Sequence, residues 1–331
     1  MTDNGKLTNA EECFSSANSY HDKGDYERAI KELDEAIKIN PNYAKAYNLR
    51  GLVYKDKGER DKAFKDFTQA IRIDSKYSKA YYNRGSANYD QGNYDQAIKD
   101  FAEAIRLDPN YAKAYSFRGF VYRKKGDYKR AIDDYDQAIK FDPNNADAYN
   151  SRGIAYFNID NYEQAMADHD KAILLDPNLA NAYYSRGNMF AALGNYDKAI
   201  ADLDMAIKIY PDNSAAYAVR GTAYRNKGNN DKAIKDFDKA LQLDPKDMLT
   251  YWERGNAYNN KGDHNKAIDD YSQATKIAPG FHYAYSSRAF VYETIGKYDK
   301  AISDWETVLQ IDPNNPDVAK NIARIRRRRG H

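Results

Sequence analysis

The 331-residue sequence contains a single cysteine, Cys13. One thiol excludes a disulfide framework and a metal site built from several cysteines, and it is typical of a reducing compartment. No apolar run approaches the roughly 20 residues that a membrane-spanning helix needs. The first nine residues are polar and lack the apolar stretch of a secretory signal. We therefore expect a cytoplasmic protein.

An excess of charge of one sign is also missing. The chain has 51 Lys and Arg against 49 Asp and Glu, a formal net charge of +2. Such a balanced surface argues against a general polyanion binder. The sequence has no phosphate loop, nucleophile elbow or dinucleotide fingerprint, and its five histidines form no i, i+4 ligand pair. We therefore predict no enzymatic activity, no cofactor and no metal.

What the sequence does have is a 34-residue repeat that runs nine times from Ala10 to Asn315. Self-similarity at a fixed period is typical of stacked supersecondary units. With the positions of each unit numbered 1 to 34, position 20 is alanine in all nine units and position 8 is glycine or alanine. We divide the chain into a polar tail (1–9), nine tandem units (10–315) and an amphipathic closing helix with a basic end (316–331).

Each unit has the pattern of two helices. Positions 4, 7, 8 and 11 mark one face of a first helix, and positions 20, 24, 27 and 28 mark one face of a second. A glycine near position 15 separates them, and a proline at position 32 ends the second helix. Glycine inside a helix is unfavourable by about 1 kcal/mol relative to alanine. Its recurrence at position 8 therefore predicts a close approach of the partner helix.

These positions carry a resemblance to the tetratricopeptide repeat family over residues 10–315. The matching features are a large residue at position 4, Gly or Ala at 8, Tyr at 11, Ala at 20 and 27, an aromatic residue at 24 and Pro at 32. The resemblance implies an all-α fold, a right-handed superhelical α-solenoid of helix–turn–helix hairpins whose first helices line a concave surface. It implies no particular chemistry.

One departure from the family pattern concerns position 7, which is usually apolar. It is arginine in eight units, and position 23 is aspartate in the same eight. The first unit lacks both, with Ser16 and Glu32 in their places. We predict a partly buried arginine–carboxylate pair at each joint, either within a hairpin or between adjacent hairpins.

The concave surface that the family places along positions 2, 5, 9 and 12 is the predicted binding site. Aromatic residues that no packing rule requires gather there, beside a basic rim and several asparagines. An asparagine amide both donates and accepts, which suits the backbone of an extended peptide. The residues predicted to bind a partner are Lys45, Lys79, Tyr82, Tyr89, Lys113, Phe120, Arg123, Ile154, Phe157, Tyr184, Asn188, Asn226, Trp252 and Asn256.

The sequence thus predicts a non-enzymatic scaffold that binds an extended segment of a partner protein, with apolar anchors and some acidic residues. Two alternatives stay open. The groove aromatics and the basic tail, Arg326 to Arg329, could instead bind RNA. The aromatic residues could also pack between neighbouring first helices, or an internal segment could fill the groove. The partner and the oligomeric state are not predicted.

Overall fold

The computed structural model describes residues 3–329, and side chains from residue 9 onward. Within these residues there are nineteen α-helices and no strands. The chain divides into two compact units, residues 1–175 and 176–331. The helices of the first unit are α1 (Asp3–Asp22), α2 (Tyr26–Ile39), α3 (Ala44–Asp56), α4 (Arg60–Ile73), α5 (Ser78–Asp90), α6 (Tyr94–Leu107), α7 (Ala112–Lys124), α8 (Tyr128–Phe141), α9 (Ala146–Phe157) and α10 (Tyr162–Leu175).

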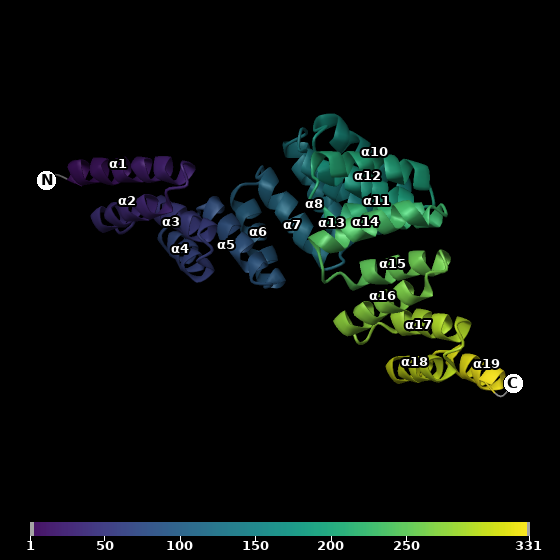
Figure 1. Cartoon of the computed structure of the whole chain (residues 1–331). Coiled ribbons are helices and arrows are strands. Elements are labelled where there is room, and N and C mark those ends of the chain that lie inside the picture. The colour runs from purple at the N-terminus through teal and green to yellow at the C-terminus, as the bar shows by residue number, and fades with distance from the viewer. Residues whose placement is uncertain (1–2, 330–331) are drawn as a thin grey trace. The chain divides into compact units, whose positions relative to one another are not determined.

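The second unit continues the same pattern. Its helices are α11 (Ala180–Ala192), α12 (Tyr196–Ile209), α13 (Ser214–Asn226), α14 (Asn230–Leu243), α15 (Met248–Asn260), α16 (His264–Ile277), α17 (His282–Thr294), α18 (Tyr298–Ile311) and α19 (Val318–Arg329). Each odd-numbered helix up to α17 pairs with the helix that follows it, and successive hairpins pack against each other within each unit (Figure 1). The predicted helical hairpins are confirmed.

The turn between the two helices of a hairpin depends on one residue in the left-handed conformation. In eight of the nine repeats it is a glycine with φ between +73° and +80°, and in the fifth repeat it is Asp160 with φ +60°. Glycine adopts this conformation without a Cβ clash. In several repeats a polar side chain then caps the second helix, as where the Asp127 side chain accepts from the Arg130 backbone N–H at 3.1 Å. The sequence therefore turns the chain back on itself at every repeat.

Close packing within each hairpin explains the small residue at position 8. A Cβ added to Gly51 would lie 2.6 Å from Cε1 of Phe67, which is shorter than real Cβ contacts. The same clash, at 2.7 Å, would occur between Gly221 and Phe237. The position-20 alanines are buried in every repeat. The predicted close approach of the two helices is confirmed.

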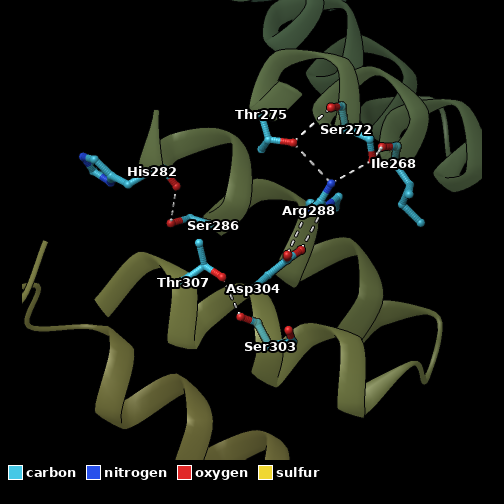
Figure 2. A network of polar contacts seen from close by, with 9 residues as sticks. All are labelled: Ile268, Ser272, Thr275, His282, Ser286, Arg288, Ser303, Asp304 and Thr307. Atoms are coloured by element: carbon cyan, nitrogen blue, oxygen red, sulfur yellow. Dashed lines mark hydrogen bonds and ion pairs between the residues drawn. The ribbon is translucent and has the colours of Figure 1, made fainter. Parts of the chain in front are cut away.

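The arginine–aspartate pairs are confirmed and have two parts. Within each of the eight hairpins that have it, the position-7 arginine donates from Nε and Nη2 to both oxygens of the position-23 aspartate, as in Arg50 to Asp66 at 2.7 and 2.8 Å. Nη1 of Arg50 also reaches Asp34 of the preceding hairpin at 2.6 Å. In Figure 2, Arg288 donates to Asp304 within its hairpin and to Ser272 and Thr275 of the preceding one. The arginine therefore joins elements both within and between hairpins.

The closing helix α19 covers the last hairpin. Val318 and Ile325 are fully buried against α18. The buried carboxylate of Glu293 on α17 accepts from Arg324 at 2.6 Å and from Arg328 at 2.9 Å. Two arginines at the basic end of the chain are thus held by a carboxylate of the same unit, which lowers the charge that this end offers to a polyanion.

Candidate peptide-binding surface

The predicted binding residues lie on or beside one stripe of the first helices in each unit. In the first unit they come from α3, α5, α7 and α9, and in the second from α11, α13 and α15. Two hollows lie on this stripe, one in each unit. We call the hollow between α7 and α9 the first hollow, and that between α13 and α15 the second hollow.

The first hollow has a volume of about 400 Å³ and is mostly apolar. Three predicted residues line it, namely Tyr82, Lys113 and Phe120. The Lys113 side chain is exposed at the rim, whereas the rings of Tyr82 and Phe120 are half-buried. The floor is formed by Tyr135, which is 1% exposed. The hollow therefore has Lys113 and the exposed Asp147 at its rim, aromatic walls and Tyr135 at its base.

Tyr82 forms a wall of the hollow rather than a protruding anchor. Its ring centroid lies 5.2 Å from Tyr111, 5.5 Å from Phe117 and 5.7 Å from Phe101. Burial raises the pKa of Tyr82 to about 12. Aromatic packing between neighbouring helices was one of the alternative interpretations of the stripe. It describes most of the contacts that the Tyr82 ring makes.

A second aromatic group lies beside the first hollow. The ring centroid of Tyr89 is 5.5 Å from Tyr94, on which it stacks, and 5.3 Å from Phe120. The Arg123 guanidinium lies 5.1 Å from the Phe120 ring centroid, within cation–π range. This geometry holds Phe120 from two sides and fixes the aromatic wall.

The remaining predicted residues of the first unit lie outside the first hollow. Lys45 and Lys79 are exposed near the start of α3 and α5. Ile154 is half-buried on α9, and Phe157, at the end of α9, packs on Tyr162 with ring centroids 5.8 Å apart. They extend the stripe along the unit without lining its hollow.

The second hollow has a volume of about 430 Å³. The predicted Asn188 and Asn226 line it, together with small residues that leave space. Neither amide has a hydrogen-bond partner among the residues that the structure describes, and their binding role stays a prediction. The floor here is Phe237, which carries no polar group.

Three predicted residues of the second unit have partners within the chain. The Trp252 indole Nε1–H donates to Ser287 at 3.0 Å, and Asn256 accepts from the Tyr271 hydroxyl at 2.8 Å. Tyr184 packs beside the core of α12 and α13, where burial raises the pKa of its hydroxyl. These contacts give the three side chains structural roles, and their binding role stays a prediction.

Several residues of the two hollows were not predicted from the sequence. Tyr135 and Ser116 belong to the first hollow, while Glu253 lines the second and forms an ion pair with Arg225 at 2.8 Å. Tyr135 occupies position 24, which the repeat pattern assigns to the core. Ser116 is at position 5 and Glu253 at position 6. A comparison of these two positions across the units was the signal that could have found them.

None of the helices among residues 3–329 is both long enough and apolar enough to span a bilayer. No curated protein matches the sequence. Solved structures resemble it at low identity. The APC/C hetero-tetramer Cut9–Hcn1 is 17% identical with a TM-score of 0.63, over 96% of this chain and 76% of that one. PilF of Pseudomonas aeruginosa is 18% identical with a TM-score of 0.58, over 64% and 97%. A tetratricopeptide repeat protein from Parabacteroides merdae is 19% identical with a TM-score of 0.56, over 75% and 98%. These likenesses show the fold alone.

Family models match most of the chain. Models of the TPR repeat match residues 17–58, 53–92, 119–160, 221–262 and 255–296. Models of the tetratricopeptide repeat match residues 78–111, 146–179, 180–213, 282–315 and 203–235. Together with the stacked hairpins, these matches support a protein-interaction scaffold in general terms. The chain belongs to the tetratricopeptide repeat family.

Proposed function

We propose that the stripe formed by the first helices binds an extended segment of a partner protein, and that the protein acts by binding rather than by catalysis. The observation that carries this proposal is the position of the two hollows. Each lies between successive first helices, on the stripe that the sequence marks out, and each is lined by residues predicted to bind. Concave apolar surfaces with a few polar groups are the usual form of ligand sites.

The two hollows offer complementary contacts to such a segment. The first has aromatic walls that cover the aliphatic part of a side chain, and Lys113 at its rim attracts acidic residues. The second presents the unpartnered amides of Asn188 and Asn226 to a peptide backbone. An extended chain exposes its backbone groups and alternates its side chains, so it can use both kinds of contact.

Selection of peptides from an immobilised library of random dodecapeptides tests the proposal. We expect the full-length protein to retain a subset of peptides. Phe120→Ala should weaken the affinity for peptides that bind the first unit by about tenfold. Asn226→Ala should do the same for peptides that bind the second unit. Leu174→Ala is the matched control, because Leu174 lies on a second helix and is 73% exposed. Affinities that the two stripe variants leave unchanged would contradict binding on this surface.

A further inference from the structure

The hydroxyl at the floor of the first hollow has no acceptor. Tyr135 is 1% exposed, and its OH has no hydrogen-bond partner among the described residues. The other tyrosine at position 24, Tyr271, donates to Asn256 at 2.8 Å. Asn256 is at position 9 of its repeat, where the repeat of Tyr135 has Phe120. A phenylalanine cannot accept, so the acceptor that satisfies one tyrosine is missing for the other.

An arginine beside this hollow lacks its carboxylate in the same way. Arg225, at position 12 of its repeat, forms an ion pair at 2.8 Å with Glu253, at position 6 of the next repeat. The corresponding residues at the first hollow are Arg123 and Ser151. The Nε atoms of Arg123 and Arg225 are both buried without a well-aligned hydrogen bond, but only Arg225 has a carboxylate within 4 Å among the described residues. The carboxylate that pairs with one arginine is replaced by a serine beside the other.

These groups gather around the Tyr135 hydroxyl. Arg123 and Ser151 both lie close enough to lower the pKa of this phenol, which burial raises. The Ser116 hydroxyl, also without a partner, lines the same hollow. Burying a polar group without a partner is unfavourable by about 1–3 kcal/mol, so several such groups in one hollow need an explanation.

The two charged side chains at the mouth of the hollow have opposite signs. Lys113 is exposed on one side of the hollow and Asp147 on the other, where solvent screens both charges. Arg123 is half-buried beside the hollow, so solvent screens its charge less. The less screened charge near the hollow is therefore positive.

We propose that the first hollow binds an acidic side chain of the partner segment, whose carboxylate accepts from Arg123 and Tyr135. This proposal rests on the proposed function and adds a specificity to it. The ligand carboxylate supplies from outside what Glu253 and Asn256 supply within the chain in the second unit. A side chain fits better than a chain terminus, because the stripe continues on both sides of the hollow along α5 and α9.

The test uses the same peptide library with two variants. Arg123→Gln removes the charge from the hollow, and Ser151→Glu installs the carboxylate that the second hollow already has. We expect the unaltered protein to enrich Asp or Glu at one peptide position, and both variants to lose this preference. Lys65→Gln is the control, because it makes the same change in net charge at an exposed site on α4.

Synthetic peptides then separate the sources of the carboxylate. A selected peptide, amidated at its C-terminus, is compared with its Glu→Gln or Asp→Asn version. The acidic version should bind the unaltered protein about tenfold more tightly or better, since hydrogen bonds to charged groups contribute about 1.5–3 kcal/mol. The difference should vanish in Arg123→Gln and shrink in Tyr135→Phe.

The outcomes separate the two proposals. Three results would overturn the acidic pocket and leave binding on the stripe intact. The retained peptides could show no preference for acidic residues, the preference could persist in both Arg123→Gln and Ser151→Glu, or it could be lost when the peptide C-terminus is amidated. Failure to retain any peptide would overturn both. Circular dichroism on each variant checks that it folds. If Ser151→Glu does not fold, the result for Arg123→Gln alone decides the test.

Discussion

The two hollows occupy equivalent places in their repeats but differ in whether the arginine beside them has a carboxylate partner. In the second, Arg225 meets Glu253 within the chain. In the first, Arg123 has no carboxylate within 4 Å among the described residues, because Ser151 stands where the second hollow has glutamate. The residue at position 6 therefore decides whether the arginine has an ion-pair partner within the chain. In a repeat protein, identical positions can serve stability in one repeat and binding in another.

Replacing each arginine in turn tests this difference between the two hollows most directly. Arg225→Gln leaves Glu253 half-buried without its partner, and we expect a loss of about 2–4 kcal/mol in the free energy of unfolding. Arg123→Gln removes a charge that has no carboxylate partner, so it should change the free energy of unfolding by less than about 1 kcal/mol. Urea unfolding of both variants measures the contrast. Equal losses would show that the two arginines have the same role.

The pH dependence of Arg225→Gln follows from Glu253. Burial raises the pKa of this carboxyl and Arg225 opposes the rise. Without Arg225 the folded-state pKa lies further above the unfolded value of about 4.3. A raised folded pKa favours the folded state below the unfolded pKa, and this advantage is lost as pH rises through the folded pKa. The deficit of Arg225→Gln relative to the unaltered protein should therefore be largest near neutral pH and shrink toward about pH 4. That of Arg123→Gln should stay constant.

Exchanging the position-6 residues should exchange the two hollows in their effect on stability and in their preference for acidic peptides. Ser151→Glu places a carboxylate beside Arg123 and should stabilise the protein by about 1 kcal/mol, whereas Glu253→Ser should destabilise it by about 1–2 kcal/mol. Thermal unfolding measures both shifts. Glu253→Ser should also give the second hollow a preference for acidic peptides. A destabilised Ser151→Glu variant would mean that Arg123 does not reach the space beside residue 151.

The repeat pattern predicted the fold because its strongest constraints are local. The glycine at position 8 indicated the close approach that Gly51 and Phe67 make, and the arginine and aspartate at positions 7 and 23 indicated their pair. The site was harder to predict, since availability depends on neighbours 15 to 35 residues away. Trp252 has the spacing of a groove anchor, yet Ser287 of the next hairpin holds its indole N–H. Tyr135 has the spacing of a core residue, yet it also lines a hollow.

The smallest expected effect concerns the two tyrosines at position 24. Tyr271→Phe removes the hydrogen bond to Asn256 and should destabilise the protein by about 1 kcal/mol. Tyr135→Phe removes a buried hydroxyl that has no partner, so it should leave stability unchanged or raise it by up to about 1 kcal/mol. The two substitutions delete the same atom at the same repeat position, so each is the control for the other. Denaturant midpoints of the two variants, measured without peptide, give the sign of each change. A loss in Tyr135→Phe as large as in Tyr271→Phe would show that the Tyr135 hydroxyl is already satisfied, and would remove one of the two donors from the acidic pocket.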